Sequence, residues 1–366
     1  MHFKYLVVGA GLSGLTVAER IASRTKETVL VIEKRDHIGG NCYDSYNEDR
    51  ILIQNYGPHT FHTSNQRVFD YLSQFTEWRE YEHHVLSFVD GKFVPFPICL
   101  KTINELYGLS LTSEEMHQFI DSRKVNIKEI RNSEDFVLSQ VGVELYEKFF
   151  KNFTIKQWGV SPKELDKSVI SRLPFRYNND TRYFTDPYQG QPKNGYTAMF
   201  RNMINNPNLK IMLNTSYQEI ARKINFDTLI YTGPIDEYYN YQFGNLMYRS
   251  IRLEFETYDV ESYQPGPSTR YPNDYEYTRV TEFKKMTGQK SDKTTILKEF
   301  PCFGGDPFYP YPTRDNKELY EKYYSLAQKE KNVFFVGRLG EYKYYNMDKV
   351  VERALNFVDA IIGNGL

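Results

Sequence analysis

The chain has 366 residues, of which 40% are hydrophobic, and a formal net charge of −1 at pH 7. A chain of this length can bury a full core in two or three domains, and its near-zero charge excludes binding of nucleic acids or membrane surfaces through bulk electrostatics. Its three cysteines, Cys42, Cys99 and Cys302, are scattered and odd in number, which excludes a disulfide scaffold and a cysteine-based metal site and favours a reducing compartment.

A glycine-rich turn at the start of the chain predicts a dinucleotide-binding unit. A run with strand composition, 5–8, leads into Gly9, Gly11 and Gly14, and apolar residues at helical spacing follow at once. In this pattern the first glycine allows a tight turn, the second lets the backbone approach a pyrophosphate, and the third lets the helix pack on the strand. The phosphates then lie at the helix N-terminus, where backbone N–H groups are free to bind them.

The next elements favour FAD as the dinucleotide. A second predicted strand, 28–32, ends in Glu33, a carboxylate at the distance expected for a ribose 2′-hydroxyl. The segment 34–41 contains a second glycine pair and resembles the stretch that follows the acid in flavoproteins of the amine oxidase and mutase kind. Near the other end of the chain, 332–340 repeats the pattern of an apolar strand followed by glycines. This late strand is expected to return to the first sheet, so that both ends of the chain build one site.

A glycine-proline turn carries two histidines, His59 and His62, and is predicted to be a loop brought to the cofactor. Two histidines three residues apart hold a metal only with further ligands, and no nearby cysteine or histidine completes such a set, so no metal site is expected. The pair is either structural or, beside a flavin, functional, and the residues alone leave both readings open.

The middle of the chain is predicted to be a hairpin followed by helices. A helix is expected over 67–75, and 85–96 alternates around an Asp-Gly pair that is typical of hairpin turns. Beyond it, a capping box at 112–115 and a serine-proline start at 161–162 mark helix N-termini. Residues 98–171 are therefore expected to form a helical insert.

The predicted fold class is α/β, with an FAD-binding Rossmann-like domain, a helical insert and an antiparallel β-sheet domain. Strands at 209–213 and 228–231 are expected to return to the cofactor sheet, and a helix is expected over 347–362. Strands at 250–255, 276–283 and 295–300, the last two joined by a loop at 288–293, form the antiparallel sheet. The expected domains are an FAD-binding domain of 1–84, 191–242 and 313–366, a helical domain of 98–171, and an antiparallel-sheet substrate domain of 85–97, 172–190 and 243–312.

The sequence gives no sign of export or of a membrane anchor. No charged or apolar leader precedes the first strand, and no apolar run approaches the roughly 18 residues that a membrane span requires. We therefore expect a cytoplasmic protein without membrane insertion, and no nucleic acid partner.

Several motifs in combination resemble the bacterial UDP-galactopyranose mutases, and the resemblance runs nearly end to end. The first glycine turn is common to many flavoproteins, whereas the histidine loop, a Gln-Trp-Gly motif and a late Gly-Arg-Leu-Gly motif are specific together and stand in the order of the family. The motifs are Gly9-Ala10-Gly11-Leu12-Ser13-Gly14, Ile38-Gly39-Gly40-Asn41, the loop 56–63, Lys156-Gln157-Trp158-Gly159, Arg172-Leu173-Pro174, the segment around Tyr183, Tyr277-Thr278-Arg279, Tyr309-Pro310, and Gly337-Arg338-Leu339-Gly340 with Tyr344.

The resemblance implies a redox-neutral isomerase that works only with reduced FAD (FADH⁻) and converts UDP-galactopyranose to UDP-galactofuranose. In the family mechanism flavin N5 attacks the anomeric carbon and displaces UDP, and the sugar ring opens and recloses through another hydroxyl, so that a cofactor acts as the nucleophile. The resemblance also implies supply of galactofuranose for cell-surface glycans, NAD(P)H or another reductant for the flavin, and a homodimer.

The resemblance assigns roles to individual positions. Catalysis is expected from Arg172, Arg279 and His62, the arginines because a guanidinium fork matches the oxygens of a leaving diphosphate. Residues expected to bind the cofactor are Gly9, Gly11, Leu12, Ser13, Gly14, Glu33, Lys34, Gly39, Gly40, Asn41, His59, Thr60, Arg338 and Met347. Residues expected to bind the substrate are Phe149, Phe153, Thr154, Trp158, Arg172, Tyr183, Arg249, Arg279, Tyr309, Tyr344 and Asn346.

Two positions depart from the family pattern and leave the substrate open. Phe153 stands where the family usually has tyrosine, so a stacking face is kept and a hydroxyl is lost, and Asn346 stands where it usually has aspartate. UDP-N-acetylgalactopyranose is therefore an alternative substrate for the same chemistry. More remote alternatives are an amine-oxidase-like flavin oxidoreductase, which shares the first motifs, and a nucleotide-sugar sensor that keeps the fold without turnover.

Overall fold

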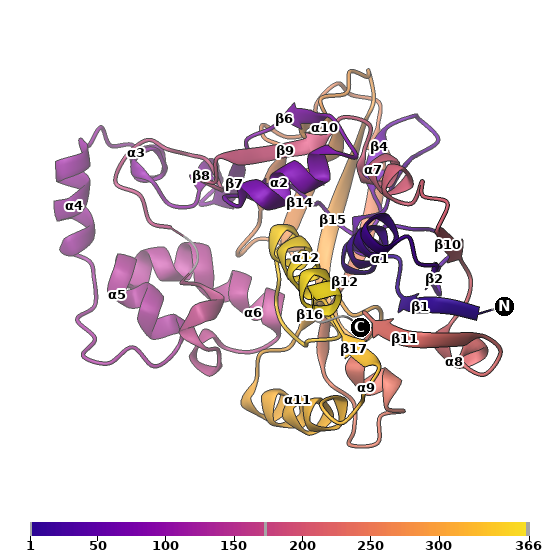
Figure 1. Ribbon diagram of the computed structural model, residues 1–366. Helices are drawn as coiled ribbons and strands as arrows, with labels where there is room; N and C mark the ends of the chain where they lie inside the picture. The colour runs from indigo at the N-terminus through magenta and orange to yellow at the C-terminus, as the bar shows by residue number, and fades with distance from the viewer. Residues whose placement is uncertain (1, 172–173, 364–366) are drawn as a thin grey trace.

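A parallel sheet brings the two ends of the chain together in the computed structural model, which describes residues 2–171 and 174–363 (Figure 1). Helices α1 (Leu12–Thr25) and α12 (Met347–Gly363) lie side by side on one face of this sheet. The return of the late strand is confirmed, because β17 extends the sheet beyond β11. The strand order is β10 (Leu209–Met212), β2 (Val29–Ile32), β1 (His2–Val8), β11 (Asn225–Tyr231) and β17 (Val333–Phe335).

The core explains why these segments pair. Strand β2 and residues 5–7 of β1 are buried and apolar throughout, the pattern of a parallel sheet that is covered on both faces. Val7 and Val31 face a core shared with α1 and α12, whereas Leu6 and Leu30 face a second core on the opposite side. Successive side chains of a strand point to opposite faces of the sheet, so each strand contributes apolar residues to both cores.

A larger sheet forms the second layer. All of its strand pairs are antiparallel except β13 with β7, which are parallel. The predicted loop at 288–293 is longer than expected, because a short helix, α10 (Phe283–Thr287), directly follows β14. The strand order is β16 (Tyr309–Pro310), β12 (Tyr248–Tyr258), β15 (Thr294–Phe303), β14 (Arg279–Glu282), β13 (Ser268–Arg270), β7 (Val85–Val89) and β8 (Lys92–Phe96).

The segment 172–190 was expected in the larger sheet, but its strand pairs elsewhere. Strand β9 (Tyr188–Pro192) lies between β5 (Phe61–Thr63) and β6 (Trp78–Glu80) in a separate three-stranded sheet. Gly190 permits this pairing, since a Cβ there would lie 2.9 Å from the carbonyl oxygen of Arg79. The remaining two strands, β3 (Asp44–Tyr46) and β4 (Leu52–Gln54), form a hairpin.

The helical insert gathers at one side of the molecule with a core of its own (Figure 1). The predicted capping box of α4 is confirmed, with Glu115 accepting from the Thr112 N–H at 2.7 Å. Ser161 caps only a short 3-10 helix, Pro162–Glu164, and not a full α-helix. The longer helices of the insert are α3 (Leu100–Tyr107), α4 (Ser113–Asp121), α5 (Ser133–Tyr146) and α6 (Asn152–Trp158), with a π-helical turn at Glu147–Lys151 between the last two.

The remaining helices complete the fold, and no helix among the described residues is long and apolar enough to cross a membrane. The predicted helix 67–75 is confirmed within one or two residues as α2. The other elements are α2 (Gln66–Ser73), α7 (Tyr196–Met203), α8 (Tyr217–Ile220), α9 (Ile235–Tyr238), α11 (Arg314–Ala327), and 3-10 turns at Gly40–Cys42 and Lys167–Val169.

Candidate active site

The glycine turn between β1 and α1 is held by contacts that leave no room for a side chain. Gly9 has a φ of +103°, and a Cβ on it would lie 2.3 Å from Thr232 Oγ1. A Cβ on Gly14 would lie 2.0 Å from the carbonyl oxygen of Gly9, so α1 approaches β1 this closely only with glycine there. Gly11 and Gly40 also meet, since a Cβ on Gly40 would lie 2.9 Å from Gly11 Cα. The two glycine motifs of the sequence therefore form one surface.

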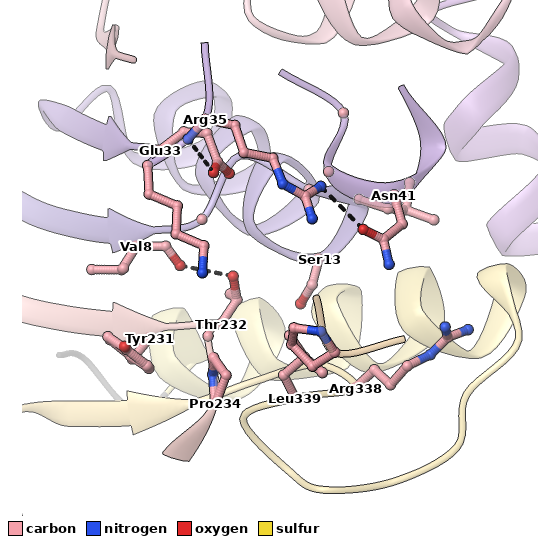
Figure 2. Close-up of a pocket in the computed structure, with 18 of the residues that line it drawn as sticks. Val8, Ser13, Glu33, Arg35, Asn41, Tyr231, Thr232, Pro234, Arg338 and Leu339 are labelled. Atoms are coloured by element: carbon pink, nitrogen blue, oxygen red, sulfur yellow. Dashed lines mark hydrogen bonds between the residues drawn. The ribbon is translucent and has the colours of Figure 1, made fainter. Parts of the chain in front are cut away.

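A cavity opens in front of this turn, at the carboxyl ends of β1, β2 and β11 (Figure 2). Parallel α/β sheets bind their ligands at this edge. Figure 2 shows Ser13 and Arg338, from opposite ends of the chain, on the wall of the same cavity. The predicted cofactor residues that line it are Gly9, Gly11, Leu12, Ser13, Glu33, Lys34, Gly39, Gly40, Asn41, His59, Arg338 and Met347.

The polar groups of this cavity fit a dinucleotide. Ser13 Oγ is buried without a hydrogen-bond partner among the described residues, and no side chain from them caps the N-terminus of α1. Both features suit a pyrophosphate, which accepts hydrogen bonds from such donors. Glu33 accepts from the N–H groups of Ala10 and Arg35, at 2.8 and 3.0 Å, and each carboxylate oxygen keeps a lone pair for a ribose hydroxyl.

His59 lies on the wall of the cavity as a neutral imidazole. Burial lowers its pKa to about 4, and the nearby positive charge of Arg338 acts in the same direction. Its Nδ1 is 2.9 Å from the carbonyl oxygen of Gly57, which can only accept, so Nδ1 carries the proton and Nε2 is the acceptor. The loop thus presents an uncharged hydrogen-bonding group to the ligand.

Arg338 lines the first cavity and packs against two residues of a second one. Its guanidinium donates to the carbonyl oxygens of Phe308 and Tyr345, at 3.1 and 2.5 Å, which fixes its position. Its Cζ lies 5.4 Å from the ring centroids of both Tyr309 and Tyr344, two residues that line the second cavity. The two cavities therefore lie on either side of one set of packed side chains.

The second cavity lies between the helical insert and the seven-stranded sheet. Its sheet wall comes from β12, β13, β14, β15 and β16, and its helical wall from α6 and the π-helical turn before it. Tyr309 and Tyr344 stack at a centroid distance of 5.4 Å. The predicted substrate residues that line this cavity are Phe153, Thr154, Trp158, Tyr183, Arg279, Tyr309 and Tyr344.

An ion pair sets the charge of this cavity. Arg279 Nε lies 3.5 Å from Glu299 Oε2, and the Glu299 side chain is buried. Burial raises the pKa of Glu299, and the Arg279 charge opposes that shift. A carboxylate beside the cation keeps Arg279 oriented, while its remaining N–H groups are available to an anionic ligand.

One residue that the family resemblance assigns to the substrate lies in a core instead. Phe149 is fully buried in the core of the helical insert, whereas its neighbour Phe150 lines the second cavity. Val141, Leu145 and Phe149 follow one another at helical spacing and share that core, so the periodicity of the sequence already indicates a buried position for Phe149. The substrate role of Phe149 rested on the motif alone.

Other predicted residues also lie outside the two cavities. Arg249 is buried and donates to the carbonyl oxygens of Gln157 and Lys156, both at 2.9 Å, so its guanidinium holds the end of α6. His62 Nδ1 pairs with Asp186 at 2.8 Å and does not line either cavity. Gly14, Thr60 and Asn346 likewise line neither cavity, and Arg172 lies outside the described residues.

Several lining residues were not predicted. Thr232, in the first cavity, follows β11 directly, and its position at the end of a parallel strand before a Gly-Pro pair is a signal that could have found it. Arg270 and Glu299 line the second cavity, but alternation along a strand does not say which charged residue faces a ligand. Phe150 carried no such signal either, whereas Gln157 stood in the Gln-Trp-Gly motif but was given no role.

His83 should make stability depend on pH. Burial lowers its pKa from 6.5 to about 3, and Arg279 and two other histidines add to the shift. Between these values the unfolded chain binds a proton that the native state does not, so stability falls as the pH falls. We expect a loss of about 2 kcal/mol between pH 6.5 and 4.5 from this residue. Urea unfolding at several pH values should show that the free energy of unfolding of His83→Gln falls less steeply with falling pH than that of the wild type. An equally steep fall in the variant would show that His83 is not the source.

Two family models match the chain. The one described as UDP-galactopyranose mutase matches residues 148–344, which include most of the second cavity. The one described as an NAD(P)-binding Rossmann-like domain matches residues 7–75, which include the glycine turn. The second match agrees with the dinucleotide cavity described above.

Similar proteins match over nearly the whole chain. The chain is 38% identical to the probable UDP-galactopyranose mutase of Klebsiella pneumoniae, over 98% of this chain and 94% of that protein. It is 35% identical to the dTDP-fucopyranose mutase of Escherichia coli, over 99% of each. The crystal structure of a reduced UDP-galactopyranose mutase has a TM-score of 0.79 at 16% identity, covering 100% of this chain and 95% of that one, and supports the fold.

Proposed function

Because the chain belongs to the UDP-galactopyranose mutase family of flavin-dependent isomerases, we propose that it converts UDP-galactopyranose to UDP-galactofuranose and requires FAD in the reduced form. The observation that carries the proposal is the position of Arg338, which lines the first cavity and packs against Tyr309 and Tyr344 of the second. The first cavity has the donors and the acid that a dinucleotide requires, and the second has two arginines and three tyrosines suited to a diphosphate.

Residues of this chain account for most of what the reaction needs. Arg279 binds the diphosphate and stabilises the charge that develops on it as the bond to the sugar breaks. Tyr183, Tyr309 and Tyr344 donate hydrogen bonds to the same oxygens, and Trp158 bounds the space for the sugar. We propose the same diphosphate-binding role for Arg172, on the family motif alone. Reduced FAD, when bound, supplies the nucleophile for the anomeric carbon, and Glu33, Ser13 and His59 are among the residues that would hold it.

The proposal is tested by turnover of UDP-galactofuranose to UDP-galactopyranose, followed by chromatography of the FAD-loaded protein with and without dithionite. We expect conversion only in the reduced sample, because the electron-rich flavin is required and no net electrons are consumed. Reduced protein with a bleached flavin spectrum and no conversion would overturn the proposal. Steady consumption of oxygen or NAD with an organic substrate would instead indicate an oxidoreductase.

The same assay should be run with dTDP-fucopyranose and UDP-N-acetylgalactopyranose. The similarity to a dTDP-fucopyranose mutase is nearly as high as that to the Klebsiella protein, so sequence identity alone does not separate these substrates. Phe153 lines the second cavity without a hydroxyl, and we propose that this position contributes to substrate preference. The ratio of kcat/KM between substrates measures that preference directly.

We further propose a cytoplasmic homodimer that is reduced by NAD(P)H or another donor and supplies galactofuranose for cell-surface glycans. The unpaired state of Cys42, Cys99 and Cys302 supports a reducing compartment. The dimer, the reductant and the glycan are supported by the family membership alone. Size-exclusion chromatography with light scattering tests the dimer, and flavin bleaching by NADH and NADPH tests the reductant.

A further inference from the structure

Three charged residues lie side by side across the sheet wall of the second cavity. Arg270 of β13 is directly opposite Arg279 of β14, and Arg279 is directly opposite Glu299 of β15. All three line the cavity. Like charges that face each other on neighbouring strands are destabilising, and Glu299 compensates for only one of the two arginines.

Arg270 has aromatic rings on its faces and a guanidinium nitrogen without a partner in the described part of the chain. Its Cζ lies 3.6 Å from the ring centroid of Phe96 and 3.7 Å from that of Phe153, so the rings cover both faces of the guanidinium. Its side chain is buried, and Nη1 has no hydrogen-bond partner among the described residues. Cation–π contacts offset part of the cost of burial, but they do not satisfy the N–H groups of Nη1.

The charge around Arg270 is not balanced by the described part of the protein. Burial lowers the pKa of the guanidinium to about 9, and the neighbouring Arg279 adds to that shift, so Arg270 is still a cation at pH 7. The lining residues of the second cavity include two arginines and one carboxylate, Glu299, which is 3.5 Å from Arg279. A buried cation without an anion is costly, and an anionic ligand removes that cost.

We propose that Arg270 is a further substrate-binding residue, whose N–H edge binds a negatively charged oxygen of the nucleotide sugar while Phe96 and Phe153 fix its plane. This inference rests on the proposed function, which brings a nucleotide sugar into the cavity. Such an oxygen belongs either to the diphosphate or to a carboxylate on the sugar ring, as in a uronic acid. In both cases Arg270 adds a positive charge beyond the Arg279–Glu299 pair.

Calorimetric titration of the FAD-loaded protein tests the proposal with UDP, uridine, UDP-galactose and UDP-galacturonic acid. If Arg270 binds the diphosphate, Arg270→Gln weakens UDP binding about tenfold or more and leaves uridine unchanged. If it binds a sugar carboxylate, Arg270→Gln leaves UDP unchanged and lowers the preference for UDP-galacturonic acid over UDP-galactose by a similar factor. Arg252→Gln is the matched control, since Arg252 also stacks on a ring, Phe300 at 3.9 Å, but lies outside both cavities.

The midpoint of thermal unfolding distinguishes a ligand-binding role of Arg270 from a structural one. Arg270→Met removes an uncompensated buried charge but keeps an unbranched side chain between the rings, so we expect an unchanged or higher midpoint together with the loss of affinity. A lower midpoint with unchanged affinity for all four ligands would overturn the proposal, as would wild-type protein that binds none of them. If UDP binds but no sugar is interconverted, the proposed function fails while the result for Arg270 stands.

Discussion

Replacing Arg279 with glutamine is expected to lower kcat for the ring interconversion by about two orders of magnitude, as loss of a partner for transition-state charge does in other enzymes. Burial alone would lower the pKa of Arg279, but the Glu299 carboxylate and nearby tyrosines raise it, so the residue stays cationic in the cavity. The charge on the diphosphate grows as the glycosidic bond breaks, and a fixed cation stabilises that state more than the bound substrate. The loss should therefore appear mainly in kcat, measured by chromatography of the reduced enzyme.

The Arg279→Gln variant needs a control for the charge that it leaves on Glu299. Removing Arg279 leaves a buried carboxylate without its cation, which costs roughly 3–5 kcal/mol in other proteins. The double variant Arg279→Gln with Glu299→Gln removes both charges and should recover the thermal midpoint without recovering turnover. Arg279→Lys should recover part of the rate, because a lysine restores the charge but not the fork. Near-normal kcat in the double variant would show that Arg279 does not act on the leaving diphosphate.

The dinucleotide cavity could be predicted from the sequence because its signals are local. Gly9, Gly11 and Gly14 stand within six consecutive residues, and a Cβ on Gly9 or Gly14 would lie 2.3 or 2.0 Å from the nearest atom, which no other residue tolerates. The acid at the end of the second strand is placed by the βαβ geometry itself. Glu33 therefore lies where the pattern puts it, on the wall of the cavity.

The second cavity could be predicted only in part, because it depends on packing between distant segments. Phe149 packs in the core with Leu145, one helical turn before it, and Arg249 binds backbone carbonyl oxygens instead of lining the cavity. Arg270 had no motif, and only the register of three strands places it beside Arg279 and Glu299. Motifs identify which residues a family uses, whereas register and helix geometry decide where this chain puts them.

Replacing Gly14 with valine is expected to reduce the flavin content of the purified protein about tenfold or more, which corresponds to a loss of about 1.4 kcal/mol or more in binding. The Cβ of any side chain at this position would lie 2.0 Å from the carbonyl oxygen of Gly9, far inside a normal contact. The atom that the Cβ meets belongs to the backbone, so no change of side-chain rotamer relieves the clash. The N-terminus of α1 must therefore move away from β1. Because the pyrophosphate needs the free N–H groups at that end, moving the helix removes them from reach.

The ratio of absorbance at 450 nm to that at 280 nm measures flavin content, and added FAD should not restore it. Gly363→Val is the matched control, since a Cβ on that glycine, at the end of α12, would meet no atom of the described residues within 4 Å. Wild-type flavin content in the Gly14 variant would show that α1 can shift on the sheet without losing the cofactor. In that case the N-terminus of α1 would not be the main source of affinity, and Glu33 and Arg338 would have to hold the dinucleotide largely through their side chains.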